Sequence, residues 1–399
     1  MAQLSLLDGA DANGSSPPWR LKAFKVALAT IIFCLSVSAV PIYNKLVFAN
    51  GVCEGDHCLR KFPYPMATAF LQLLLVSAVL GVVNIFGHFV CDRSKSWIFG
   101  PHFRYKLRHI APVGVLFGLK YGVTNWGLQL VPTGVHLLLQ STDVIWTILL
   151  AEVVNQEDLG LLEVGAAFLS AGGSALIGLH AADTLQAPLV PLLVNLLPPF
   201  LLALCVSTLR MGAKELFRPD NRLNGSITPT EFTAIKLALS SATALVLACL
   251  REGPGPDRIA WWTALEEESA AGIALMLLGG VFVLIFQVNL TWLAGLTSVA
   301  TVGIIGGVKV IPQWILNALF QFQVDLNPLN LMGAALVLLA TSIYAVASYR
   351  TARIAIKKPD CCCCAGKTRS LSRSGLLEEA LLESDHRALL ETGVPTTPA

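Results

Sequence analysis

The chain has 399 residues, of which 54% are hydrophobic and only 14% charged, and its formal net charge is +2. A soluble domain carries roughly 25% charged residues, so this composition excludes an ordinary soluble globular protein. No basic stripe with interleaved aromatic residues is present, which gives no reason to expect a nucleic-acid partner. We therefore expect an all-α polytopic membrane protein in a lipid bilayer.

The first 25 residues are predicted to form a cytosolic tail. Asp8 and Asp11 precede the first basic residue, Arg20, whereas cleavable signal and transit peptides are basic and poor in acidic residues near their start. We expect the first apolar run to act as an uncleaved insertion signal.

Ten segments are apolar over about the 20 residues that a membrane-spanning helix needs. They cover approximately residues 26–48, 65–90, 110–131, 134–153, 161–180, 188–209, 230–250, 270–293, 297–319 and 329–349. Pro312, inside the ninth segment, frees a backbone carbonyl and is expected to kink that helix. We predict ten transmembrane helices.

Basic residues concentrate in alternate connections between these segments. One side holds Arg20 to Lys25, Arg93 to Arg108, Arg210 to Arg222 and Arg350 to Lys358, and the other holds only Arg60, Lys61, Arg251 and Arg258. Because connections rich in Lys and Arg stay in the cytosol, we predict that both termini are cytosolic.

The segments divide into two groups of five with matching layouts. Residues 26–180 and 181–349 each contain a long second connection and a very short third one, and Asn125 and Thr133 align with Asn289 and Thr297. Five is an odd number, so the second group enters the membrane from the opposite side. This predicts two inverted five-helix repeats, a design that transporters use for alternating access. Residues 350–399 are predicted to form a cytosolic tail.

Ionisable residues inside the segments are few, and each is a candidate functional residue because a charge at membrane depth is costly. Lys120 and Asp143 lie near the middle of the third and fourth segments, and Lys309 near the middle of the ninth. Lys120 and Asp143 can form a buried ion pair that holds their hairpin together, or line a cavity. For Lys309 we favour a ligand role, and Lys236 is expected to extend to the membrane interface.

The lysines outnumber the aspartate, which favours an anionic solute such as a phosphate or nucleotide ester. Tyr121, Thr124, Asn125 and Gln140 lie beside the charges and can bind hydroxyl groups or a base, although such groups also bond between helices. His136 stands alone in an apolar run, and no carboxylate pair exists within the membrane. We expect no enzyme, metal or cofactor.

Cysteines suggest two modifications. Cys53 and Cys58 share one loop on the predicted lumenal side, where they can form a disulfide. Cys361, Cys362, Cys363 and Cys364 follow the last segment on the cytosolic side, which suits palmitoylation. Asp385 stands four residues before Leu389 and Leu390, the spacing of an acidic dileucine sorting signal that cytosolic sorting adaptors bind.

Three groups of residues resemble a known family. They are Ile42-Tyr43-Asn44-Lys45 with Phe62-Pro63-Tyr64-Pro65, then Val123-Thr124-Asn125-Trp126 with the run to Leu150, and finally Thr301 to Lys309 with Leu326 to Asn330 and Gly333. In order and spacing they resemble the nucleotide-sugar and triose-phosphate transporter family of the drug/metabolite transporter superfamily, over residues 26 to 349. The resemblance implies a ten-helix transporter with a central site.

Departures from the triose-phosphate branch concern charge. Thr124 and Lys309 match its phosphate-binding residues, whereas Gln140 stands where that branch has a lysine, Val310 where it has an arginine and Tyr121 where it has a histidine. With fewer cations to hold a small phosphate, the resemblance implies a larger anion, such as a nucleotide-sugar exchanged for a nucleoside monophosphate.

We therefore predict an antiporter for a nucleotide-sugar or related organic anion, with Lys120, Tyr121, Thr124, Asn125, Gln140, Asp143 and Lys309 around the substrate. The resemblance implies the Golgi membrane, and the dileucine an endosomal or lysosomal membrane. A regulatory or scaffold protein and an exporter of another small metabolite stay open as alternatives, and so does a homodimer.

Overall fold

A computed structural model of the chain describes residues 19–45, 53–54, 57–58, 62–91, 97–100, 102–131, 136, 139–140, 142–181, 189–218, 220–255, 259–320 and 328–357. Contacts divide the chain into two units, Met1–Thr351 and Ala352–Ala399. The described helices belong to the first unit, apart from the end of the last helix.

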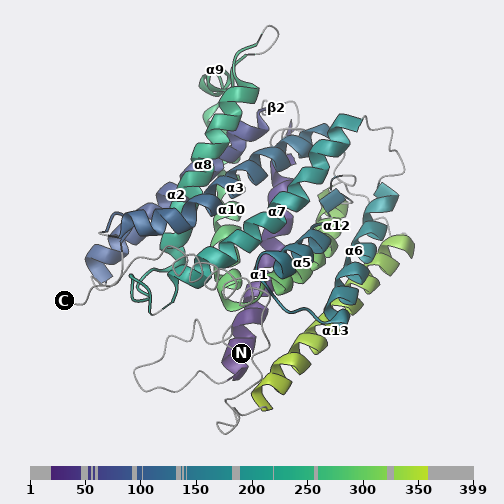
Figure 1. Cartoon of the computed structure of the whole chain (residues 1–399). Helices are drawn as coiled ribbons and strands as arrows, with labels where there is room; N and C mark the ends of the chain where they lie inside the picture. Colours follow the sequence, from purple (N-terminus) through teal and green to yellow (C-terminus); the bar gives the residue numbers. More distant parts are fainter. Residues whose placement is uncertain are drawn as a thin grey trace, which may run out of the picture. The chain divides into compact units, whose positions relative to one another are not determined.

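Helices dominate the described part of the chain (Figure 1). They are α1 (Trp19–Lys45), α2 (Pro65–Phe86) with the π-helical turn η2 (Gly87–Cys91), α3 (Phe103–Leu130), α5 (Asp143–Val153), α6 (Leu161–Ala181), α7 (Leu189–Leu216), α8 (Pro229–Glu252), α9 (Trp261–Glu266), α10 (Ala270–Leu296), α11 (Val299–Val308), α12 (Val310–Phe320) and α13 (Pro328–Lys357). Two-residue strands, β1 (Cys53–Glu54) and β2 (His57–Cys58), pair antiparallel.

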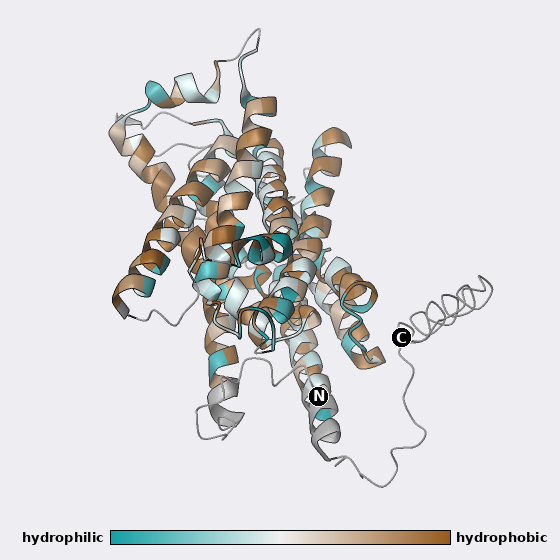
Figure 2. Ribbon diagram, turned by 60° about the vertical axis from the view of Figure 1, so that its left-hand side comes forward, coloured by the Kyte–Doolittle hydropathy of each residue, from teal (hydrophilic) through white to brown (hydrophobic). Residues whose placement is uncertain are grey.

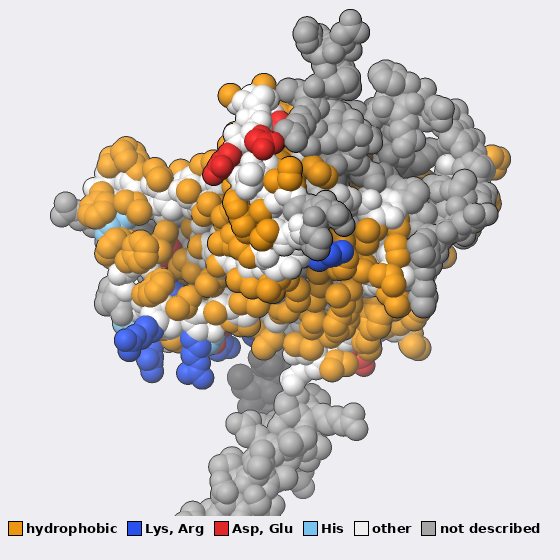
Figure 3. All heavy atoms as spheres, turned by 90° about the horizontal axis from the view of Figure 1, so that it is seen from above, with side chains coloured by type: hydrophobic (Ala, Val, Ile, Leu, Met, Phe, Trp, Pro, Cys, Tyr) orange, Lys and Arg blue, Asp and Glu red, His pale blue; other side chains and the backbone are white. Residues whose placement is uncertain are grey.

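Six of the described helical stretches are long and apolar enough to cross a bilayer. They are Phe24–Asn44, Pro65–Val90, Leu193–Leu216, Pro229–Glu252, Ala270–Leu296 and Pro328–Ser348. Large apolar side chains on their outer surfaces, such as Phe86 and Leu250, are exposed. Hydrophobic residues predominate along these helices (Figure 2), and hydrophobic side chains cover much of the surface seen in Figure 3. Such a surface is suited to lipid rather than to water.

Short-range signals explain where several helices begin. Pro65 and Pro229 occupy the first turns of α2 and α8, where a missing N–H costs nothing. The hydroxyls of Thr228, Ser269 and Ser298 precede α8, α10 and α11 and accept hydrogen bonds from backbone N–H groups of their first turns.

The first turns of α3 and α8 are joined by a buried ion pair. The amine of Lys106 lies 2.5 Å from Glu231 Oε1, and it also donates to the carbonyl of Trp97 at 2.7 Å. Lys106 was assigned to a cytosolic connection on charge alone, yet its side chain is only 1% exposed. A basic residue that marks a connection can therefore also fix two helices together.

Helix α3 packs against both α7 and α8, and Gly118 of α3 lies close to the backbone of α8. A Cβ atom on Gly118 would lie 2.4 Å from the carbonyl oxygen of Ser240. One turn earlier, the Ser240 hydroxyl donates to the carbonyl of Gly114 at 2.8 Å. Glycine is required at position 118 because a rigid backbone atom occupies the space of a side chain.

We predict that Gly118→Ala lowers the unfolding temperature in detergent, because the added methyl group forces α3 away from α8. Overpacking of this kind costs about 1–3 kcal/mol. Gly81→Ala on α2 is the matched control, since no atom lies within 4 Å of its built Cβ. Equal unfolding temperatures for the two variants would show that the α3–α8 contact is not tight.

Candidate functional site

A cavity in the first unit collects every residue predicted to bind substrate. Lys120, Tyr121, Thr124 and Asn125 reach it from α3, Gln140 and Asp143 from the start of α5 and the residues before it, and Lys309 from the junction of α11 and α12. Apolar side chains of α1, α7 and α10, among them Phe33, Leu202 and Phe286, complete its wall. The sequence thus selected residues that are far apart in the chain and lie together in space.

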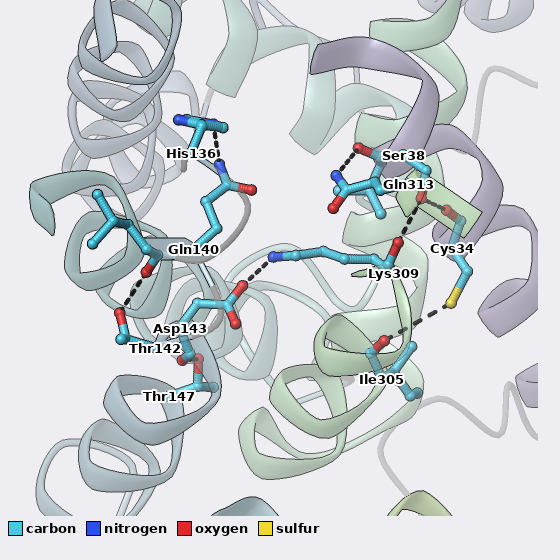
Figure 4. Close-up of polar contacts among 12 residues, drawn as sticks. Cys34, Ser38, His136, Gln140, Thr142, Asp143, Thr147, Ile305, Lys309 and Gln313 are labelled. Atoms are coloured by element: carbon cyan, nitrogen blue, oxygen red, sulfur yellow. Dashed lines mark hydrogen bonds and ion pairs between the residues drawn. The ribbon is translucent and has the colours of Figure 1, made fainter. Parts of the chain in front are cut away.

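The central contact in the cavity is an ion pair between Lys309 Nζ and Asp143 Oδ2 (Figure 4). Both side chains are buried, at 3% and 5% exposed. Of the two alternatives for Lys120 and Asp143, an ion pair within their hairpin or a place in a cavity wall, the structure has the second, since both residues line the cavity. Asp143 pairs instead with Lys309, 166 residues further along the chain. The ion pair joins the first half of the chain to the second.

A helix end favours the charge of Asp143. Asp143 is the first residue of α5, and the start of a helix carries a partial positive charge that stabilises a carboxylate. Lys309 lies between the end of α11 and the start of α12, so the opposite partial charges of the two helices offset each other there.

Lys309 also marks an interruption in the ninth predicted segment. Helix α11 ends at Val308 and α12 begins at Val310, four and two residues before Pro312. Pro312 has no N–H to donate to the carbonyl of Val308, and the helix is interrupted at Lys309, in the turn before Pro312. The Ser38 hydroxyl of α1 donates to the carbonyl of Lys309 at 3.1 Å and anchors this break.

Lys120 differs from Lys309 because no acidic side chain among the described residues forms an ion pair with it. Its amine lies 4.6 Å from the centroid of the Tyr121 ring. The Tyr121 hydroxyl accepts a hydrogen bond from Gln287 Nε2 at 2.5 Å. Thr124 Oγ1 is buried without a hydrogen-bond partner in the part of the chain that the structure describes. A cation and a hydroxyl are thus available to a ligand.

The two amides of the site are already engaged with the protein. Asn125 accepts from Asn44 Nδ2 at 3.3 Å and donates to the carbonyl of Pro65 at 3.2 Å, which ties α3 to α1 and α2. Gln140 Nε2 lies 2.8 Å from His136 Nε2, and His136 Nδ1 lies 2.7 Å from Asn195 Oδ1. The amide donates to Nε2, so His136 carries its proton on Nδ1.

The sequence suggested that His136 stands alone, but its ring contacts both Gln140 and Asn195. It orients Gln140 toward the cavity through a chain that ends in α7, where Asn195 Nδ2 donates to the carbonyl of Pro191 at 2.9 Å. This role was not predicted, because Asn195, which completes the chain of contacts, lies on a different apolar segment from His136 and Gln140.

Lys236 corrects a second prediction. Rather than extending to the membrane interface, its side chain is fully buried, donates to Thr291 Oγ1 at 3.0 Å and lies 4.7 Å from the centroid of the Phe117 ring. Helices α3 and α10 both pack against α8, and they enclose a lysine that the sequence places near a helix end.

Several predicted sites lie outside the described residues or side chains. Cys53 and Cys58 face each other in the register of β1 and β2, but only their backbone is described. The cysteine cluster at residues 361–364 and the sorting signal at Asp385, Leu389 and Leu390 fall outside the described part of the chain. These modifications stay predictions.

Comparisons with known proteins support the fold and leave the family open. No family model and no curated protein matches the sequence. One solved crystal structure is similar at a TM-score of 0.54 and 14% identity, over 82% of this chain and 98% of the other. At this identity the similarity shows the fold alone. The fold and site together define a helical protein with several apolar, membrane-length helices around a small charged cavity.

We predict that Asp143→Asn and Lys309→Met each lower the unfolding temperature strongly, whereas the double variant recovers most of the loss. Removing one partner leaves a buried charge unpaired, which costs about 3–5 kcal/mol, and removing both does not. Thermal unfolding in detergent measures this, with Asp158→Asn, an exposed aspartate on the next connection, as the control. Strictly additive losses in the double variant would contradict the pairing.

Proposed function

We propose that the protein is a secondary transporter, an antiporter that exchanges a nucleotide-sugar or a related organic phosphate for a second anion. The observation that carries the proposal is the cavity in which Lys120 and Lys309 meet Asp143. Two cations and one carboxylate give the cavity a positive balance, and cations without full internal compensation attract an anion. The family resemblance of the sequence supports the same class.

The substrate class follows from the donors around the charges. A phosphate group needs cations and hydroxyl donors, which Lys309, Lys120 and Thr124 supply. Tyr121 and Gln140 lie on the same wall and suit the ring and hydroxyl groups of a nucleotide or sugar. The apolar wall of α1, α7 and α10 suits a base or ring face rather than a second phosphate.

Reciprocal helix contacts support ten spans arranged as two inverted five-helix repeats. Helix α1 packs on α10 as α7 packs on α3, and α3 packs on α8 as α10 packs on α2. In each comparison, every helix of the first pair is replaced by its counterpart in the other half of the chain: α1 by α7, α2 by α8 and α3 by α10. Such exchange symmetry is expected when two homologous halves face each other with opposite orientation.

The contact between α2 and α8 shows the antiparallel relation directly. Near the end of α2, Asn84 Oδ1 accepts from the hydroxyl of Thr230 at the start of α8, at 3.0 Å. At the end of α8, the carboxylate of Glu252 accepts from the N–H groups of Met66 and Ala67 at the start of α2, both at 2.8 Å. Each helix end therefore binds the start of the other.

On the predicted cytosolic side, Glu157 and Arg210 bind helix ends. Glu157, between α5 and α6, accepts from the N–H groups of Val299 and Ala300 at the start of α11, at 2.8 and 3.1 Å. Arg210 of α7 donates to the carbonyls of Ala294 and Gly295 at the end of α10. Burial raises the pKa of the Glu157 carboxyl, against the lowering effect of these N–H groups and of Arg210.

The proposed substrate requires a larger cavity than the one described. The cavity has a volume of about 50 Å³, whereas sites for small organic ligands measure roughly 300–1,000 Å³. A nucleotide-sugar does not fit a cavity of this size, so the proposed transport requires a conformational change. A rocking motion of one half against the other would enlarge the cavity toward one side at a time, which is the alternating-access mechanism we propose. By resemblance we assign it to the Golgi membrane.

Exchange in liposomes tests the function. Purified protein in vesicles loaded with a nucleoside monophosphate should take up at least one labelled nucleotide-sugar, and Lys120→Gln should weaken uptake at least about 30-fold by removing a buried cation from the anion. Lys120 is preferred to Lys309 because its loss breaks no ion pair. Lys214→Gln, an exposed lysine on α7, should behave as the parent.

The contradicting result is equally specific. If no member of a broad nucleotide-sugar panel is exchanged by protein that is folded in the vesicles, the transport proposal is wrong. Equal uptake by the Lys120→Gln variant and its parent would leave transport in place but remove Lys120 from the anion site.

A further inference from the structure

Asp143 is an anion built into an anion site. Its Oδ2 holds Lys309, while Oδ1 has no hydrogen-bond partner among the described residues. Asp143 therefore binds the amine of Lys309, the cation that a substrate phosphate needs. On the proposed function, which this inference deepens, the substrate and Asp143 compete for the same amine.

Cations and weak acids surround Asp143 from each packed element. Lys309 faces it from the α11–α12 junction and Lys120 and Tyr121 from α3, with His136 in the segment before α5. Other titratable side chains described on the helices packed against α5 are Cys205, Arg210, Lys214 and Glu215 of α7 and Glu163 of α6, and Cys34 lies on α1. Asp143 is the only carboxylate among the described residues that line the cavity.

The charge balance shows what binding must change. Lys120 and Lys309 carry two positive charges, and a nucleoside-diphosphate sugar carries two negative ones. With Asp143 ionised, the loaded and closed cavity would hold one uncompensated negative charge, and a buried unpaired charge is very costly. With Asp143 protonated, the loaded cavity is neutral.

We infer that Asp143 is a proton-coupling residue: it binds Lys309 in the empty transporter and takes up one proton when a substrate dianion binds Lys309. The O–H bond forms on Asp143 from a solvent proton, and the contact between Asp143 and Lys309 breaks as the phosphate contact forms. When the anion leaves on the other side, the proton leaves with it and the ion pair forms again. Anion and proton thus cross the membrane together.

Exchange of one dianion for another hides this coupling, because equal numbers of protons then move in both directions. Binding reveals it. If one proton is taken up per anion, the dissociation constant rises about tenfold for each unit of increasing pH. Nucleoside-diphosphate sugars are suitable probes because their two charges stay constant between about pH 6 and pH 8. Any pH dependence of the dissociation constant then belongs to the protein.

The experiment uses purified full-length protein in weakly buffered detergent with a pH-indicator dye. UDP-glucose, UDP-N-acetylglucosamine and GDP-mannose are added in turn, and binding is followed by a filter assay in the same samples. We expect about one proton taken up per anion bound in the parent, and none in Asp143→Asn at whatever affinity that variant retains. Asp158→Asn, the exposed control, should keep the parent ratio.

Outcomes separate the two proposals. Binding or exchange without proton uptake, with a dissociation constant that is flat against pH, overturns the coupling role and leaves the transport function standing. No binding and no exchange with any of the three sugars or the wider panel overturns both. If Asp143→Asn does not fold, Asp143→Glu replaces it, and the pH dependence of the parent protein alone decides the inference.

Discussion

The structure depends on the ion pair between Asp143 and Lys309, two charges held within a protein whose surface is built for lipid. Removing either side chain leaves the other charge buried without its partner, which favours keeping the two helices together. One helix belongs to the first half of the chain and the other to the second. The pair thus joins the two halves of the chain at the cavity.

Helix ends make further contacts between the two halves of the chain. Lys309 and Asp143 lie at helix termini, Glu157 binds the start of α11, and Glu252 binds the start of α2. Buried N–H groups at helix starts require acceptors, and in these places a carboxylate from another helix supplies them. These contacts involve few atoms at the ends of rigid helices, so the helices can separate there without losing their internal hydrogen bonds. The transport that we propose requires contacts that can break and form again in this way.

Sequence reasoning found the polar residues of the cavity because an ionisable residue in an apolar run is conspicuous. It could not find their partners. The short hairpin suggested Lys120 as one alternative partner of Asp143, and nothing in the sequence indicates that Lys309 lies within reach of it. Lys236 was placed at the interface from its position in a segment, but burial depends on the neighbouring helices. Length and hydropathy identify six membrane-length stretches among the described helices, whereas the prediction of ten spans rests on ten apolar segments of the sequence.

The most direct test of the account is an experimental structure of the protein with a nucleotide-sugar bound. We predict that the phosphates lie against the amine of Lys309, with Lys120 on their other side, and that the carboxylate of Asp143 has moved out of contact with Lys309. A bound nucleotide-sugar elsewhere in the protein, with the ion pair between Asp143 and Lys309 intact, would contradict the central claim that this pair is the substrate site.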